Sequence, residues 1–189
     1  MKKYLFLLLC FTVIFQACKE DEAVPEPTNL LRYDAENFSA PSLDEGIYEA
    51  AARFNMDDVT EFQGKQLTGV NVYFVGVPPS PRVKVYAQGT GNVPGELLYD
   101  SVLQPSETAS DSWTNHILTT PVDIPAEGLW IAVRIDHPVD NFGSVGCDEG
   151  SADPNGDLMF VNGDNIWTTL RDFTNGATDI NWNIRGIIE

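Results

Sequence analysis

The residues best suited to chemistry are the carboxylates of two Gly- and Asn-containing stretches, VGCDEGSADPNGD and VNGDN. Calcium binds six to eight oxygen atoms from carboxylates, amide side chains and backbone carbonyls, and glycine permits the tight loops that aim them. The spacing does not match an EF-hand, so the indication is compositional, and a solvated acidic loop is the alternative. The candidate ligands of a structural Ca²⁺ ion are Asp148, Glu149, Asp153, Asp157 and Asp164.

Aromatic side chains offer a second kind of chemistry, because their faces can stack on the apolar C–H faces of sugar rings. Trp130 and Trp182 lie within apolar stretches, where a tryptophan is more often a packing residue. Trp167 instead follows the polar stretch NGDN, which makes it the preferred ligand contact. Trp113 and Tyr86 are the other predicted ligand-binding residues, with core packing as the alternative for each.

Catalysis would have to start from His116, His137 or Cys147. A cysteine nucleophile needs a neighbouring base and an activating environment, whereas the two acids that follow Cys147 would raise the pKa of its thiol. The sequence contains no GxSxG, HExxH or P-loop motif. We therefore predict no catalytic residue, and a polysaccharide hydrolase that uses two of the 28 acidic residues is the remaining enzymatic alternative.

The elements that position these residues are predicted to be β-strands. RVKVYAQ alternates apolar and polar residues over 82–88, and LTGVNVYFVGV is apolar on both faces over 67–77, as in a central strand. Clusters of Gly, Pro and Asn separate the segments, so the pattern predicts one all-β domain, a two-sheet β-sandwich or jelly roll. Further strands are expected at 96–103, 112–118, 129–136, 157–161 and 181–188, and 47–54 is expected to be a strand or a short helix.

The N-terminus has the pattern of an export signal. Two lysines precede the apolar run YLFLLLCFTVIF, which is shorter than the roughly 20 residues that a membrane span needs. The change at Cys18 from apolar to acidic sequence resembles the lipobox of bacterial lipoproteins, in which the cysteine thiol is acylated. The predicted organisation is a signal peptide over 1–17, a lipidated, acidic, Pro-containing flexible tether over 18–33 and a β-sandwich domain over 34–189. An ordinary secreted protein is the alternative.

Charge and cysteine content narrow the function classes. The formal net charge is −17, and it becomes −19 when the two lysines of the signal peptide are removed. Nucleic-acid binding needs clustered Lys and Arg, so we exclude it. Cys10 leaves with the signal peptide and Cys18 is the lipidation site, which leaves Cys147 alone in the domain. No intrachain disulfide is therefore expected in the mature domain.

From about Ala50 to the C-terminus the chain contains, in this order, LTGVNVYF, PGELLYD, TTPVDIPAEGLWIAVRID, VGCDEG, GDNIWTTL and NWNIRGII. This order is similar to the jelly-roll adhesin modules of secreted Gram-negative proteins, of the cleaved-adhesin (gingipain-adhesin-like) kind. The resemblance implies a jelly roll related to galactose-binding-like and carbohydrate-binding modules, often with structural calcium and without catalytic activity. The acidic KEDE after Cys18 also resembles the signal that sends some Gram-negative lipoproteins to the outer face of the outer membrane.

We therefore predict a surface-anchored, non-catalytic lipoprotein of the outer membrane, whose sandwich faces the cell exterior and binds a glycan or an extracellular protein. Membrane contact is expected through the N-terminal lipid, and structural Ca²⁺ is the one cofactor expected. The first alternative is an accessory structural subunit of an outer-membrane assembly, with protein partners only. The second alternative is a hydrolase that acts on polysaccharide.

Overall fold

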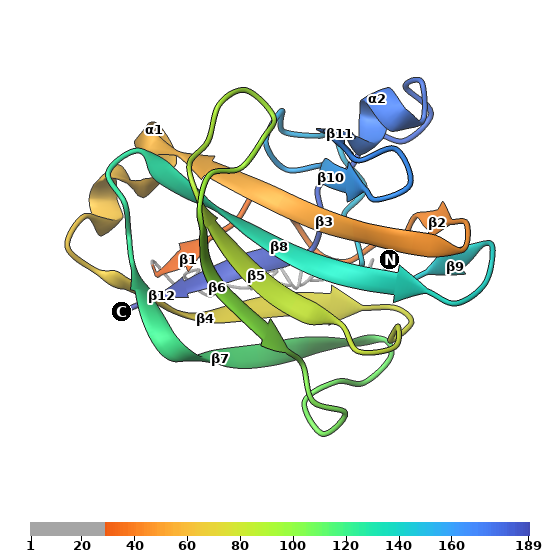
Figure 1. The fold of residues 1–189 in the computed structure, drawn as a ribbon, viewed down its shortest axis with the longest axis horizontal. Helices are drawn as coiled ribbons and strands as arrows, with labels where there is room; N and C mark the ends of the chain where they lie inside the picture. Colours follow the sequence, from red (N-terminus) through yellow and green to blue (C-terminus); the bar gives the residue numbers. More distant parts are fainter. Residues whose placement is uncertain (1–28) are drawn as a thin grey trace, which may run out of the picture.

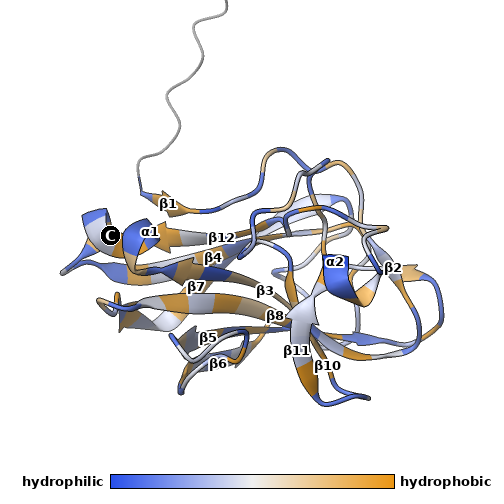
Figure 2. Ribbon diagram, turned by 90° about the horizontal axis from the view of Figure 1, so that it is seen from above, coloured by the Kyte–Doolittle hydropathy of each residue, from blue (hydrophilic) through white to orange (hydrophobic). Residues whose placement is uncertain are grey.

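The computed structural model describes residues 29–189. The signal peptide expected at 1–17, the lipidation site Cys18 and the tether up to residue 28 lie outside the described residues. In the described part, two antiparallel sheets pack against each other, and Figure 2 shows them from above as two layers. The predicted β-sandwich is confirmed.

Four strands form the first sheet, in the order β1-β12-β4-β7. Each pair of neighbours is antiparallel, and Figure 1 shows β12, β4 and β7 side by side. The strands are β1 (Leu30–Leu31), β12 (Ile184–Ile188), β4 (Gln66–Phe74) and β7 (Ser112–Asp123).

Six strands form the second sheet, in the order β11-β10-β3-β8-β5-β6. They are β11 (Ile166–Thr169), β10 (Leu158–Val161), β3 (Gly46–Asn55), β8 (Gly128–His137), β5 (Arg82–Ala87) and β6 (Leu97–Val102). A small pair, β2 (Ser42–Leu43) and β9 (Phe142–Gly143), lies beyond the ends of β3 and β8 (Figure 1). The helical turns are α1 (Met56–Val59), the 3₁₀ turn η1 (Thr60–Phe62) and α2 (Leu170–Phe173).

The strands are nested like one long hairpin that has been rolled up. β5 pairs with β6, β4 with β7, β3 with β8 and β1 with β12, and every pair is antiparallel. Successive pairs fall in alternate sheets, so the first and last strands of the described part lie side by side. The β10–β11 hairpin is added outside this arrangement, along the free edge of β3.

The strands expected from the sequence are present with small shifts in their bounds, and the 47–54 segment is the strand β3. β1, β2, β9 and β11 were not expected. β1, β2 and β9 have two residues each and show no alternation. β11 has four residues and directly follows a polar turn, so its start does not stand out from the turn residues.

The first described residues pack into the sandwich. Leu31, which lies in the stretch predicted to be the tether, is 3% exposed and pairs with Gly186 of β12. Tyr33 stacks on Phe54 with ring centroids 5.0 Å apart, and its hydroxyl donates to Asp58. The packed part of the chain therefore begins before residue 34.

Alternation along the strands fills the space between the two sheets. In β4, Val70, Val72 and Phe74 are fully buried, and they share one core cluster with Ile131 and Val133 of β8. Burying one such side chain stabilises the fold by about 1.5–3 kcal/mol relative to leaving it exposed. Among the described residues the single cysteine is a free thiol, so this packing holds the layers together without a disulfide.

One buried ion pair connects the start of the domain to its last strand. Arg185 Nε donates to both carboxylate oxygens of Asp34, at 3.0 and 2.9 Å, and Asn183 Nδ2 donates to Oδ2 at 2.8 Å. The Asp34 side chain has no exposed surface, and burial raises its pKa although Arg185 opposes the shift. Removing one member of such a pair leaves the other charge buried without compensation.

We expect Asp34→Ala to lower the free energy of unfolding by about 3 kcal/mol, because Arg185 loses its charge partner and Asn183 loses an acceptor. Urea unfolding followed by tryptophan fluorescence measures this change. Glu36→Ala, which removes an exposed acid two residues away, is the control and should change the stability by less than about 0.5 kcal/mol. Equal effects of the two variants would contradict the role of the ion pair.

Candidate binding site

The outer surface of the six-stranded sheet carries side chains that the strand register brings together. Ala51 of β3 pairs with Ala132 of β8, and Ala132 pairs with Lys84 of β5. Side chains alternate between the two faces of a strand, so residues two positions away point to the same side. We call this set the aromatic face, and it consists of Glu49, Ala51, Arg53, Arg82, Lys84, Tyr86, Asp100, Trp130, Ala132, Arg134, Asp136, Leu158, Phe160 and Trp167.

Trp167 is at the centre of an aromatic cluster on this face. Its ring centroid lies 5.4 Å from those of Trp130 and Phe160 and 6.3 Å from that of Tyr86. The contacts with Trp130 and Tyr86 are edge-to-face. Trp130 is fully buried, whereas Tyr86 and Trp167 pack on it and stay partly exposed. The cluster therefore presents aromatic surface to solvent on a fixed base.

A polar network borders the aromatic cluster. Tyr86 Oη donates to Glu49 Oε2 at 2.7 Å, and Lys84 Nζ donates to Glu49 Oε1 and, at 3.1 Å, to Tyr86 Oη. Burial, followed by the negative charge of Glu49, raises the pKa of Tyr86, so the phenol stays protonated and acts as a donor. Glu49 is 6% exposed, and the three groups hold one another in a fixed orientation.

The loop between β5 and β6 closes one end of the aromatic face. Gln88 Oε1 accepts the indole N–H of Trp130 at 2.7 Å, and the carbonyl of Gly91 accepts a hydrogen bond from Arg53 Nη1 at 2.9 Å. The Arg53 guanidinium lies 5.8 Å from the centroid of the Trp130 ring. The same loop borders a cavity of about 420 Å³, which is lined by Asn92, Ala152, Pro154, Asp157, Thr169, Arg171 and Asp172.

Trp113 lies on the other sheet and does not join this site. It belongs to β7, its ring meets Tyr73 edge-on with centroids 5.5 Å apart, and the Arg185 guanidinium lies 4.1 Å from its ring centroid. That guanidinium is fixed by the buried ion pair described above, so it covers part of the indole. The structure thus brings two of the three predicted ligand residues together, Trp167 and Tyr86, and separates the third.

Asp148, in the acidic loops, is saturated by hydrogen bonds from the protein itself. Its Oδ1 accepts the backbone N–H groups of Gly150 and Asn181, at 2.9 and 2.7 Å. Its Oδ2 accepts the backbone N–H of Ala35 and the side-chain amide of Asn181. These four donors occupy the roughly four lone-pair sites of a carboxylate. Asp148 therefore has no lone pair left for a cation.

The other predicted calcium ligands do not converge. Asp153 accepts the backbone N–H of Asn155, and Asp157 accepts the backbone N–H of Arg171 in α2. Glu149 and Asp164 are exposed. Within residues 29–189, no group of three or more His, Cys, Asp or Glu side chains is arranged to hold a metal ion. The calcium site stays a prediction from composition, and the side chains as placed do not supply its ligand set.

The three residues considered for catalysis are all buried. His116 is hydrogen-bonded to Glu107 and to Tyr99, at 3.0 and 2.9 Å. His137 and Cys147 are each 1% exposed. Burial raises the pKa of the Cys147 thiol, as does the neighbouring acid, which keeps it away from the reactive thiolate form. None of the three side chains is presented to a substrate in solution.

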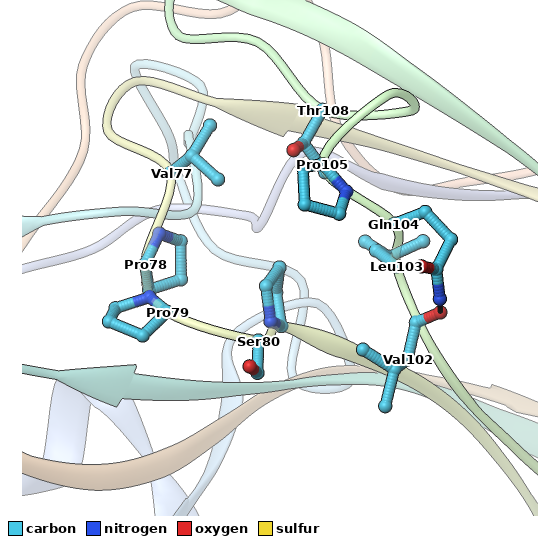
Figure 3. Close-up of a pocket in the computed structure, with 10 residues that line it drawn as sticks. Val77, Pro78, Pro79, Ser80, Val102, Leu103, Gln104, Pro105 and Thr108 are labelled. Atoms are coloured by element: carbon cyan, nitrogen blue, oxygen red, sulfur yellow. Dashed lines mark hydrogen bonds between the residues drawn. The ribbon is translucent and has the colours of Figure 1, made fainter.

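A second cavity, of about 350 Å³, opens between the β4–β5 and β6–β7 loops. Figure 3 shows the rings of Pro78 and Pro79 on one side and Pro105 on the other. Its lining contains no charged side chain, histidine or cysteine, so it offers no general base to activate the hydroxyl groups of Ser80 and Thr108. The lining residues are Val77, Pro78, Pro79, Ser80, Pro81, Val102, Leu103, Gln104, Pro105 and Thr108.

The chain matched no family model, no curated protein and no solved structure. Its resemblance to cleaved-adhesin modules therefore stays a prediction that rests on the residues quoted above. In the part of the chain that the structure describes, no helix is long and apolar enough to cross a membrane.

Glu49, Lys84 and Arg134 of the aromatic face were not predicted as site residues from the sequence. A local signal was present for two of them. Lys84 and Tyr86 occupy alternate positions of RVKVYAQ, and Glu49 is the one charge between Ile47 and Ala52. Their meeting depends on β3, β8 and β5 being neighbours, which no local pattern states.

Asp157, in the 420 Å³ cavity, makes the stability of this region depend on pH. Burial raises its pKa from 3.8 to about 6. A carboxyl group with a raised pKa contributes stability that is fully present below its unfolded pKa and is lost as the pH rises through its folded pKa. Each pKa unit corresponds to about 1.4 kcal/mol, so Asp157→Asn should raise the free energy of unfolding at pH 7 by about 1–3 kcal/mol.

The gain from Asp157→Asn should disappear when the pH falls to about 4, because the native carboxyl is then protonated as well. Urea unfolding near pH 4, 5.5 and 7 measures the difference between the variant and the native chain. Glu127→Gln, at an exposed turn position, should show no such pH-dependent difference. A gain from Asp157→Asn that is constant over this range would contradict the assignment.

Proposed function

We propose that this chain is a non-catalytic, carbohydrate-binding module of a lipid-anchored surface protein. The observation that carries the proposal is the aromatic face. There, the partly exposed Trp167 is held edge-on by Trp130 and Tyr86 beside a Glu49–Lys84 ion pair. Aromatic surface suits the C–H faces of a sugar ring, and a few fixed polar groups next to it suit the ring hydroxyls.

The polar network keeps capacity for a ligand. An ammonium group has three donors, and an ionised carboxylate has about four acceptor sites. Lys84 uses two donors and Glu49 uses two acceptor sites within the network. One N–H of Lys84 and two lone-pair sites of Glu49 are therefore not used within the network, and the Lys84 side chain, at 16% exposed, is the more accessible of the two. Because the groups are already ordered by one another, binding costs less conformational entropy than it would with free side chains.

The arrangement of carboxylates favours binding over hydrolysis. Glycoside hydrolysis requires two carboxyl groups that flank the scissile bond, about 5–10 Å apart. Glu49 is held by Lys84 and Tyr86, and Asp100 on β6 accepts a hydrogen bond from Arg82 at 2.8 Å. Both groups are therefore engaged in fixed pairs. Among the described carboxylates of this face only Asp136 has no hydrogen bond or ion pair, and one free carboxylate does not make the pair that hydrolysis requires. Turnover of labelled polysaccharide by the purified chain would instead support the hydrolase alternative.

The finer fold and the location belong to the same proposal. Nested antiparallel pairs that fall in alternate sheets support a jelly-roll connectivity. The N-terminal sequence supports a lipid on Cys18 and a place in the outer membrane, with the sandwich facing the exterior. An accessory subunit of an outer-membrane assembly would differ in its partners. It would bring stoichiometric proteins with it from solubilised membranes and would bind no glycan.

Trp167→Ala is expected to weaken glycan binding by at least about tenfold, or about 1.4 kcal/mol, because it removes the exposed ring of the cluster. A glycan array probed with the purified full chain identifies a ligand, and calorimetric titration compares the two affinities.

Ile166→Ala is the matched control, because Ile166 is the neighbouring residue on β11 and its side chain is 47% exposed. Its glycan affinity should equal that of the native chain, and the melting temperatures of both variants show whether the fold persists. Undiminished affinity of a folded Trp167→Ala protein, or failure of the native chain to bind any glycan, would overturn the proposal.

Cys18→Ser is expected to release the protein from the membrane, because the lipid can no longer be attached to a thiol. Fractionation of cells that express the native chain or the variant measures the membrane-bound share, and mass spectrometry detects the acyl chains. A native chain without acyl mass, found in the soluble fraction, would refute the anchoring part of the proposal.

A further inference from the structure

The aromatic face gathers the cations of an acidic chain. Residues 29–189 contain 24 acidic and eight basic residues. Half of the basic residues project from the outer surface of the six-stranded sheet, on β3, β5 and β8. These residues are Arg53, Arg82, Lys84 and Arg134.

Three of these four cations already have partners, namely the carboxylates of Glu49 and Asp100 and the carbonyl of Gly91. Arg134 is different. It has no hydrogen bond or ion pair with any residue that the structure describes, and its side chain is partly exposed. Asp136, two residues along the same face of β8, forms no ion pair with it.

Arg134 stands in the middle of the sheet, opposite Glu49 of β3 on one side and Arg82 of β5 on the other. A guanidinium group is always charged and presents a planar fork of N–H donors. This fork matches the two oxygens of a carboxylate or of a sulfate group and binds them through two parallel hydrogen bonds. Arg134 thus offers an anion site on a face that also carries the aromatic cluster.

The register connects this anion site to the aromatic cluster. Trp167 pairs with Phe160, Phe160 pairs with Glu49, and Glu49 pairs with Arg134, so three strand spacings separate Trp167 from Arg134. At about 4.8 Å per spacing, the two backbones are about 14 Å apart. A ligand that reaches both must be longer than one sugar ring. We propose that the ligand is an acidic oligosaccharide whose carboxylate or sulfate group binds Arg134 while a sugar ring packs on Trp167, which rests on the carbohydrate-binding function proposed above.

Two pairs of saccharides that differ in charge alone test this inference. The purified full chain is titrated with polygalacturonate oligosaccharides and with their methyl-esterified, neutral counterparts. We expect the acid to bind at least about tenfold more tightly than the ester, which corresponds to about 1.4 kcal/mol. Dextran sulfate and unmodified dextran form the second pair. Whichever pair shows the larger preference for its charged member identifies the anion as carboxylate or sulfate.

Variants then assign the preference to one side chain. Arg134→Gln should reduce the affinity for the charged saccharide to that for the neutral one. Arg134→Lys keeps the charge but loses the planar fork of donors, so its affinity for the charged saccharide should lie between those of the native chain and Arg134→Gln. Lys65→Gln removes an exposed cation that lies away from this face and should leave both affinities unchanged. The melting temperature shows whether Arg134→Gln folds. If it does not, the affinities of the native chain for the charged and the neutral saccharides still test whether the ligand is acidic.

The two proposals fail in different ways. Equal affinity for the charged and neutral members would overturn the acidic ligand and leave carbohydrate binding intact. Loss of binding to every saccharide, neutral or charged, would overturn both. A preference for acid that a folded Arg134→Gln protein retains would overturn the role of Arg134.

Discussion

The ten-residue antiparallel register between β3 and β8 is the constraint on which both the core and the aromatic face depend. It places Ala51 opposite Ala132 and Arg53 opposite Trp130 on the outer side, and buries the alternate residues between the sheets. Because the side-chain period of a strand is two, a slip of one residue would exchange the two sets. Gly128 fixes the end of the register. Its φ is 102°, and a Cβ there would lie 2.1 Å from the carbonyl oxygen of Phe54. The burial that stabilises the core therefore also positions the aromatic face.

The aromatic face has a small core of its own, separate from the one between the sheets. Ala51, Ala132, Leu158 and Trp130 are fully buried there, beneath Tyr86 and Trp167. Alanine on two adjacent strands leaves space above the sheet, and the large rings fill it. The indole N–H of Trp130 is satisfied by a loop side chain, so the buried ring carries no unpaired donor. Side chains locked in this way on strands hold a binding geometry better than side chains on loops.

The sandwich could be predicted from the sequence because alternation is a local property, and it is visible within RVKVYAQ or around Leu129. The grouping of site residues could not. Trp167 and Tyr86 lie far apart in the chain, and whether they share a face with Trp113 depends on which sheet each strand joins. The acidic loops show a second limit. The composition shows how many oxygen atoms a loop contains but not whether they are free. The carboxylate of Asp148 already accepts hydrogen bonds from backbone and amide N–H groups of its own chain.

The acidic residues that give the chain its net charge lie mostly far from the aromatic face, whereas a ligand on that face is close to the charges of the face itself. At physiological ionic strength, charges in solvent are largely screened beyond about 8 Å, so the acids on distant loops contribute little at the aromatic face. If the face binds a ligand as proposed, the charges on the face itself decide which ligand it prefers. Glu49 and Asp100 offset Lys84 and Arg82 there, and both pairs are held in place by hydrogen bonds. A ligand that replaced one member of either ion pair would leave the remaining member without its partner, which lowers the binding free energy gained. An anion that binds Arg134 does not lose free energy in this way, because it breaks no existing ion pair.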